Sequence, residues 1–319
     1  MIKLSKLRRF FLGANSGISY RIDDDINYRL YKSQIQCEFS CFEVQAEVER
    51  LLRDIMLQRG DSGAFELPER KLFFNRFMGD SSFKAKAMEK SDISIKVFDC
   101  EEKETKELRY SIKSMLGSPA TILNSSKHTD FKYRIDNFCD EYMYDVNKID
   151  TKAKLLDRIN KIYNCGGKIP FVSVPSDSFK SNLELVDEGF PLKFANALLY
   201  SYAYKEKSLL SAYCKSNSKE DEKTNITDLT SFLNAISFGF VPSKMWNGKC
   251  EVDGGLFIVK GNGDVVLLDR TKHSQEVETY LIGNTKFDSP SSSRYHMLEI
   301  FKESSDYYFT LNLQLRYKK

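Results

Sequence analysis

The sequence predicts a mixed α/β fold, with helices in the middle of the chain and strands on either side of them. Residues 91–115 alternate polar and apolar side chains in two short runs, and the chain returns to such alternation from residue 255 onward. Between them, residues 149–236 place apolar side chains at helical spacing. A period of two is typical of half-buried strands, and a period near 3.6 is typical of amphipathic helices.

The first predicted element is an amphipathic helix over residues 38–58, which carries Glu43 and Glu47 on its polar face. Two strands follow, SDISIKVFD from residue 91 and a second from Leu108 to Met115, with a charged loop between them. This pattern predicts an antiparallel hairpin. The run FKYRI predicts a further strand.

The middle of the chain predicts helices at LLDRINKIYN, FANALLYSYAYKEKSLLSAY and DLTSFLNAI, and the polar stretch 215–225 predicts a mobile loop. After it, GLFIVKGNGDVVLLDR predicts two strands around a Gly-Asn-Gly turn, and YYFTLNLQLRY alternates. We therefore expect a core with the predicted hairpin over residues 1–140, a helical layer or subdomain over 141–240, and a β-rich part over 241–319 packed on the core.

Composition indicates a soluble, folded chain. Apolar residues make up 41% and charged residues 29%, and 48 basic residues nearly balance 45 acidic ones. A DNA-binding surface therefore requires local segregation of charge. Seven cysteines without a CxxC pair indicate reduced thiols and a cytoplasmic location rather than structural zinc. Because no run of about 20 apolar residues occurs, no membrane span is expected.

Asp92, Ser111 and Lys113 are the candidate catalytic residues. Hydrolysis of a phosphodiester needs a divalent metal held by carboxylate oxygens and a cation that stabilises the developing charge. Ser111 and Lys113 fall on one face of a strand, and a hairpin brings that face beside Asp92. We expect Mg²⁺ as the cofactor. A solvated strand edge would explain the same residues without any catalytic role.

This constellation lacks one carboxylate, because Ser111 occupies a position where an acidic residue is expected. Glu47 on the first helix is the predicted second metal ligand, together with Asp92, and Glu43 one turn earlier is its competitor. A solvated helix face is the alternative explanation for both glutamates.

Two polar clusters are predicted to contact DNA, because hydroxyl, amide and basic side chains bind phosphates and base edges. In the second cluster, Arg294 is the candidate for a bidentate guanine contact, and an ordinary surface ion pair is the alternative. The turn at Asp253 to Gly255 has three possible roles: a metal site, a close approach of the backbone, or a simple turn before a strand. The clusters are Ser114, Ser118, Asn124, Ser125, Ser126, Lys127, His128 and Thr129, and Asn284, Thr285, Lys286, Ser291, Ser292, Ser293 and Arg294.

Three blocks of the sequence resemble the HpaII-type restriction endonucleases. They are YSIKSMLGSPATILNSSKHTDFKYRI, GFVPSKMWNGKCEVDGGLFIVKGNGDVV and YLIGNTKFDSPSSSRYHMLEIFKE, followed by a strand like FTLNLQLRY. The order of Asp92, Ser111 and Lys113 is similar to a relaxed PD-(D/E)xK motif, in which the position of Ser111 holds Asn or Gln in small nucleases that cut CCGG or GCGC. The resemblance implies that Asp92 holds the metal and that Lys113 orients or activates the water.

The resemblance also implies a PD-(D/E)xK nuclease-like central mixed β-sheet flanked by helices, with DNA recognition in the C-terminal part. The expected activity is Mg²⁺-dependent cleavage of double-stranded DNA at a short GC-rich site such as CCGG, in partnership with a cognate DNA methyltransferase. A palindromic site favours a homodimer on DNA, although relatives can act as monomers. The rival interpretations are a sequence-specific DNA-binding protein without cleavage activity and a structural or protein-interaction domain.

Overall fold

The computed structural model divides into two compact units, which are residues Met1–Ser118 with Glu251–Lys272 and residues Pro119–Cys250 with His273–Lys319. These units cut across the three consecutive segments predicted from the sequence, because strands from distant parts of the chain pair within each unit. The structure describes residues 10–11, 18–23, 26–31, 34–40, 42–43, 46–47, 49–50, 53–54, 91–99, 104–115, 119–262 and 264–318.

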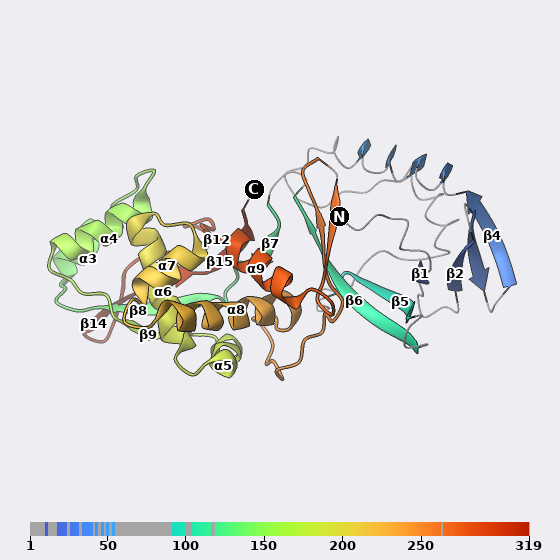
Figure 1. The fold of residues 1–319 in the computed structure, drawn as a ribbon. Coiled ribbons are helices and arrows are strands. Elements are labelled where there is room, and N and C mark those ends of the chain that lie inside the picture. Colours follow the sequence, from blue (N-terminus) through green and yellow to red (C-terminus); the bar gives the residue numbers. More distant parts are fainter. Residues whose placement is uncertain are drawn as a thin grey trace. The chain divides into compact units, whose positions relative to one another are not determined.

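The first unit contains a five-stranded mixed sheet and a three-stranded antiparallel sheet (Figure 1). In the mixed sheet, β6 pairs antiparallel with β5 and parallel with β10. The predicted hairpin and the strand pair around the Gly-Asn-Gly turn are confirmed as β5–β6 and β10–β11. The five-stranded sheet has the strand order β1 (Phe10–Phe11), β5 (Ile93–Asp99), β6 (Glu104–Ser114), β10 (Gly255–Val259) and β11 (Val265–Asp269). The three-stranded sheet has the order β2 (Ile18–Asp23), β3 (Ile26–Tyr31) and β4 (Gln34–Ser40).

The helix predicted over residues 38–58 begins later than expected, because residues 38–40 complete β4. The described residues at 42–43, 46–47, 49–50 and 53–54 are helical. At the junction, the hydroxyl of Ser40 accepts a 3.0 Å hydrogen bond from the backbone N–H of Glu43. A serine in this position satisfies an N–H group that has no partner within the helix, and it therefore favours a helix start directly after the strand.

The second unit contains two further sheets, of three and four strands. β8 pairs antiparallel with β14 over six residue pairs, and Leu313 leads from β14 into β15 of the other sheet. The strands predicted at FKYRI and YYFTLNLQLRY are therefore confirmed. In sheet order, the strands are β12 (Thr285–Asp288), β15 (Gln314–Tyr317) and β7 (Thr121–Leu123), and β13 (Phe301–Glu303), β14 (Asp306–Asn312), β8 (Asp130–Ile135) and β9 (Phe171–Ser173).

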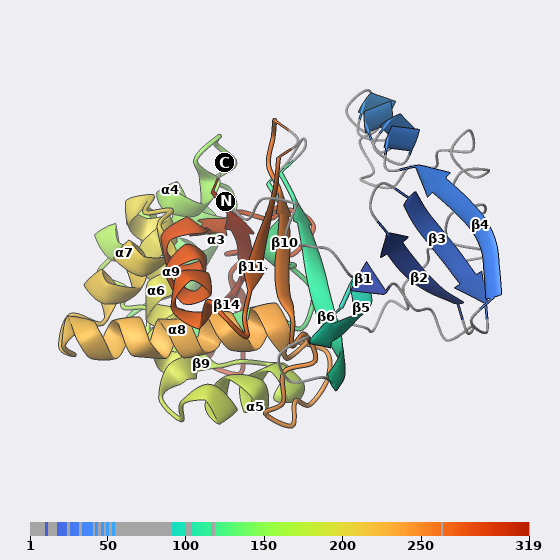
Figure 2. The same cartoon turned by 45° about the vertical axis from the view of Figure 1, so that its right-hand side comes forward.

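Helices α3 to α9 also belong to the second unit (Figure 2). α4 to α8 lie in the predicted helical middle, whereas α9 lies in the part that was predicted to be β-rich. The run from residue 194 to 213 is two helices instead of one, because the chain turns at Lys205, which adopts a left-handed φ of 54°. Within the described residues, no helix is long and apolar enough to cross a membrane. The helices are α3 (Asp140–Asn147), α4 (Lys154–Asn164), α5 (Asp177–Val186), α6 (Phe190–Tyr204), α7 (Leu209–Ser216), α8 (Glu222–Phe238) and α9 (Ser274–Asn284).

An aromatic core joins these helices to the sheets of the second unit. The rings of Phe190 and Phe194 lie 4.9 and 4.7 Å from that of Phe232, and Phe194 also packs against Phe131 of β8. All four side chains are fully buried. Burial of one such ring contributes about 1.5–3 kcal/mol, so this cluster is a major source of the stability of the unit.

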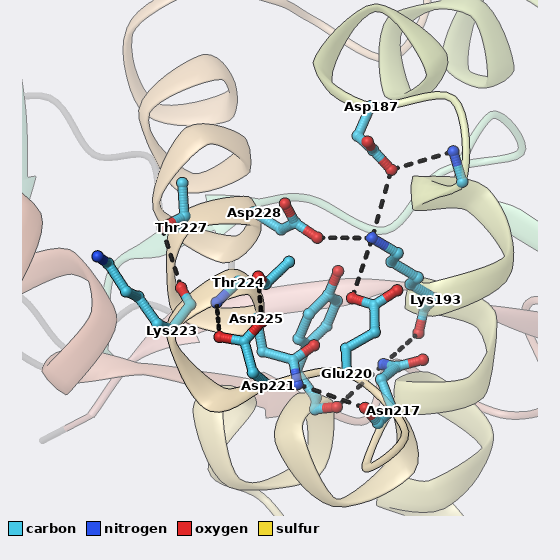
Figure 3. A network of polar contacts seen from close by, with 12 residues as sticks. Asp187, Lys193, Asn217, Glu220, Asp221, Lys223, Thr224, Asn225, Thr227 and Asp228 are labelled. Carbon is cyan, nitrogen blue, oxygen red and sulfur yellow. Dashed lines mark hydrogen bonds and ion pairs between the residues drawn. The ribbon is translucent and has the colours of Figure 1, made fainter.

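The predicted mobile loop at 215–225 is largely ordered, since α7 runs to Ser216 and α8 begins at Glu222. Asp221 caps α8 by accepting a 3.0 Å hydrogen bond from the backbone N–H of Thr224. Beside it, Lys193 Nζ on α6 points toward three carboxylates (Figure 3), at 3.5 Å from Asp187, 3.1 Å from Glu220 and 2.7 Å from Asp228. A single α6 lysine therefore holds the α7–α8 connection in place.

Replacing Lys193 with methionine is expected to destabilise the second unit by about 1–2 kcal/mol, because three carboxylates would then face one another without a cation. Partial burial works against the charge of Lys193, but its carboxylate contacts raise its pKa overall, so it stays charged at neutral pH. Chemical denaturation measures the loss. Lys180→Met, which removes an exposed pair with Glu184, is the matched control, and an equal loss in both variants would contradict the expectation.

Candidate functional site

The β5–β6 hairpin brings Asp92 against Ser111. Asp92 lies directly before β5, and its backbone N–H donates a 2.9 Å hydrogen bond to the carbonyl of Tyr110 on β6. Its side chain then reaches across to the neighbouring strand. Asp92 Oδ2 accepts hydrogen bonds from Ser111 Oγ at 2.9 Å and from the backbone N–H of Ile112 at 2.6 Å. The two contacts fix the orientation of the carboxylate.

Lys113 lies two residues beyond Ser111 on β6 and is partly buried. Removal from water lowers the pKa of its ammonium group, and the nearby charge of Asp92 opposes this shift. Within the described part of the chain, Lys113 Nζ forms no ion pair within 4.0 Å and no hydrogen bond. A partly desolvated lysine that is coupled to a carboxylate without being neutralised by it is suited to binding an anion.

β10 supports this strand from its other side. Gly254 lies so close to the ring of Tyr110 that a Cβ atom there would be 2.5 Å from Tyr110 Cζ. Asp253 Oδ1 accepts a 2.6 Å hydrogen bond from the backbone N–H of Arg109. Burial, followed by the charges of Asp269 and Asp253, raises the pKa of Tyr110 to about 12. Of the three roles considered for residues 253–255, the contacts show a close approach of the backbone.

The metal-binding capacity of this centre is partial. Both hydrogen bonds to the Asp92 carboxylate end on Oδ2, and Oδ1 accepts none from the described residues, so it can coordinate a hard cation. Ser111 is only 1% exposed and uses its hydroxyl to hold Asp92. It is therefore a positioning residue. Among the residues that the structure describes, no three His, Cys, Asp or Glu side chains form a group that could hold a metal.

Glu47 stays a predicted ligand. It forms an ion pair with Arg50 one helical turn away, at 2.5 Å, and its side chain is 17% exposed. The competitor, Glu43, lies at the start of the same helix, where its backbone N–H is bound to Ser40. A metal site at Asp92 would need a further carboxylate, and Glu47 and Glu43 are the two that the sequence predicts.

The first predicted DNA-binding cluster is divided between the two units. Ser114 ends β6 in the first unit, and Ser118 lies outside the described residues. The other members form the loop between β7 and β8 in the second unit, which we call the 124–129 loop. Lys127 at its tip is exposed. Thr129 is fully buried and hydrogen-bonded within the loop, so its prediction as a DNA contact is wrong.

The second cluster also separates into two parts. Asn284 and Thr285 end α9 and bind back to its carbonyl groups, and Thr285 is fully buried, which corrects its prediction as a DNA contact. Lys286 lies in β12. The remaining members, Ser291, Ser292, Ser293 and Arg294, begin a turn over residues 291–299, here called the 291–299 loop.

The two loops lie together in the second unit, although 170 residues separate them. Tyr295 Oη donates a 3.1 Å hydrogen bond to the carbonyl of Ser125 and accepts one of 3.3 Å from its hydroxyl. Neither Tyr295 nor Asn312, whose buried amide binds the 124–129 loop, was predicted from the sequence. Alternation places Asn312 among the polar positions of its strand, so the sequence pattern gave no signal for its burial.

Within the described residues, the hairpin therefore combines an oriented carboxylate with a lysine that has no ion-pair partner. A carboxylate oxygen can coordinate a hard cation, and a partly desolvated ammonium group can bind an anion. Residues 6–317 match the family described as HpaII restriction endonuclease. The chain is 32% identical over 287 residues to the type II restriction enzyme HpaII of Haemophilus parainfluenzae. The aligned region covers 86% of this chain and 77% of that relative. The chain belongs to the HpaII restriction endonuclease family, as the three sequence blocks indicate, and is therefore an enzyme of the restriction endonuclease class. No solved structure matches it.

Proposed function

We propose that this chain is a type II restriction endonuclease with a PD-(D/E)xK-like centre that cuts both strands of DNA at a short GC-rich site, with CCGG as the expected target. The proposal is carried by the Asp92–Ser111–Lys113 arrangement, in which the carboxylate is oriented and the lysine remains unpaired. Family membership supports the same function. The proposal includes a cognate DNA methyltransferase, because the host must protect its own sites from cleavage. It also includes a cytoplasmic location, where the enzyme can reach DNA.

In this mechanism, Asp92 presents Oδ1 to a divalent cation, for which we propose Mg²⁺, and Ser111 keeps the carboxylate from rotating away. When bound, the cation lowers the pKa of a water molecule and polarises the phosphoryl group. Lys113 supplies a fixed positive charge where negative charge develops on the phosphate oxygens. Glu47 is the proposed second carboxylate.

Digestion of a mixed-sequence plasmid tests the proposal directly. Discrete fragments are expected with Mg²⁺ and none with EDTA, and end-sequencing of the fragments should place the cuts at CCGG, with 5′-phosphate ends. Plasmid methylated at that site should resist. Binding of DNA without cleavage in Mg²⁺, Mn²⁺ or Co²⁺ would favour the rival, a DNA-binding protein that lacks catalysis.

Ser111→Ala is expected to weaken the cation site by about 10–100-fold, the usual cost of losing a hydrogen bond that orients a metal ligand. The Mg²⁺ concentration for half-maximal cleavage should rise by this factor, and so should the Ca²⁺ concentration that stabilises the DNA complex against heat, which does not depend on catalysis. Ser111→Thr keeps the hydroxyl and should retain most of the affinity. Equal metal dependence in all three proteins would contradict the role of Ser111.

A further inference from the structure

We infer that Tyr295 is a positioning residue that joins the 124–129 and 291–299 loops into one base-reading surface and directs Arg294 toward a guanine. This inference rests on the proposed function. It assigns the recognition of the target to a defined part of the second unit, through a residue that the sequence alone did not single out.

Tyr295 contacts both loops through different parts of its side chain. Its hydroxyl exchanges two hydrogen bonds with Ser125, at 3.1 and 3.3 Å. Its ring lies beneath the guanidinium of Arg294, with 5.4 Å between Arg294 Cζ and the ring centroid. A guanidinium held against an aromatic face loses less freedom on binding than a mobile one, so the tyrosine prepares Arg294 for a directed contact.

The end of the 291–299 loop is held by two polar side chains, the partly buried Asn147 and the buried Arg158. The amide of Asn147 both donates to the carbonyl of Ile300 at 2.8 Å and accepts from its N–H at 2.9 Å. The buried guanidinium of Arg158 donates to the carbonyl of Leu298 at 2.8 Å. His296 and Leu298 have left-handed φ values of 47° and 55°. Side chains other than glycine rarely adopt this conformation, so the surrounding contacts must hold the loop in one shape.

The 124–129 loop is held equally firmly. Asn312, which is fully buried, donates to the carbonyl of Ser126 at 2.6 Å and to the carboxylate of Asp130 at 2.8 Å. The hydroxyl of Thr129 closes the loop on Ser126 at 3.1 Å. Two loops that are each rigid and are linked through one tyrosine form a preorganised surface.

This surface carries two exposed basic side chains, and its exposed carboxylate, Glu299, contacts His296 of the same loop at 2.8 Å. Lys127 and Arg294 are both exposed, and neither forms an ion pair within 4.0 Å with another described residue. A planar guanidinium matches O6 and N7 of guanine, whereas the point charge of a lysine suits a phosphate. The surface therefore offers one group for base reading and one for backbone contact, which a GC-rich duplex can use together.

The test compares cleavage of a CCGG duplex with cleavage of duplexes that differ from it by one base pair. Tyr295→Phe keeps the ring but removes both hydrogen bonds, and it should lower the ratio of the kcat/KM values for the two duplexes by about 10-fold; Arg294→Ala should lower it at least as much. The double variant should lose no more than Arg294→Ala alone, because Tyr295 acts through Arg294. Tyr308→Phe, which removes an exposed hydroxyl bound to Asp306, is the matched control.

A changed melting temperature with an unchanged ratio for Tyr295→Phe would overturn the inference and leave Tyr295 with a purely structural role. If the wild-type protein does not cleave any DNA, the proposed function fails separately, and the same duplexes then serve in equilibrium binding. Discrimination between duplexes that is lost in Tyr295→Phe would still support the inference. Equal binding to all duplexes by the wild-type protein would reject it.

Discussion

Replacing Lys113 with alanine is expected to lower the cleavage rate by about 10²–10³-fold, the loss typical when one group that stabilises transition-state charge is removed. The ammonium group is partly buried beside Asp92 and has no ion-pair partner within the described residues, so no other described charge replaces it. DNA affinity should change little, because Lys113 is one cation among many. Single-turnover cleavage and equilibrium binding, measured on the same duplex, separate the two effects.

Lys260→Ala is the matched control, since Lys260 is an exposed lysine of the same unit in the turn after β10. A tenfold or greater rate loss in this control, or unimpaired cleavage by Lys113→Ala, would contradict the assignment. Lys113→Arg should recover little activity, because the larger planar group does not fit the space of an ammonium.

The lowered pKa of Lys113 gives a second test with a defined sign. The unfolded chain, in which the lysine has its ordinary pKa of 10.5, binds this proton more tightly than the folded chain. The buried charge therefore lowers the stability of the fold at every pH below the folded pKa. Stability then rises as the pH increases from the folded pKa toward 10.5. Lys113→Met should therefore be more stable than the wild type at neutral pH, and its advantage should shrink in alkaline solution. Cleavage should fall as the pH passes the lowered pKa, because the cation is lost.

Arg158→Ala is expected to destabilise the second unit by about 3–5 kcal/mol, because it leaves one buried and two partly buried carbonyl groups without their donor, at up to roughly 1–3 kcal/mol each, and removes a buried side chain. The guanidinium, in a residue only 4% exposed, donates to Leu298 at 2.8 Å, to Asn147 at 2.7 Å and to Ile149 at 3.2 Å. Arg158→Lys should recover only part of the loss, since one ammonium cannot reach three divergent acceptors.

Thermal unfolding measures this effect, which should lower Tm by about 6–20 °C for a unit of this size. Arg134→Ala is the matched control, because Arg134 is an exposed arginine paired with Asp136, and it should change stability by less than about 0.5 kcal/mol. Similar losses in the two variants would show that Arg158 does not hold the 291–299 loop.

Local patterns predicted the β5–β6 and β10–β11 strand pairs, because alternation is a property of short segments, but they did not predict the sheet of β2, β3 and β4 or helix α9. The hairpin of Asp92 and Ser111 is such a local feature, and the contact between these residues follows from it. The helix at residue 42 was placed too early because Glu38 and Phe39 fit a helical pattern as well as they fit the strand that they form. Pairing with β3 decides between the two, and it is not visible in a local window.

Local sequence patterns could not predict the two units either, because strand pairing between distant segments defines them. The predicted segments followed the change from strand-like to helix-like hydrophobic spacing along the chain, whereas the units follow long-range pairing such as that of β6 with β10. The sequence pattern also does not show which polar side chains are buried. Thr129 and Thr285 belong to polar clusters in the sequence, but both face the interior, where their hydroxyls satisfy backbone carbonyls.

The parallel pairing of β6 with β10 sets the order in which the enzyme can mature on the ribosome. Arg109 and its partner Asp253 are 144 residues apart. At a synthesis rate of about 5–20 residues per second, the catalytic hairpin waits roughly 7–30 s for this neighbour. After the first unit is complete, only residues 273–319 of the second unit remain to be made. A product of interrupted translation that ends before residue 251 lacks β10, the strand that pairs with β6 beside Lys113.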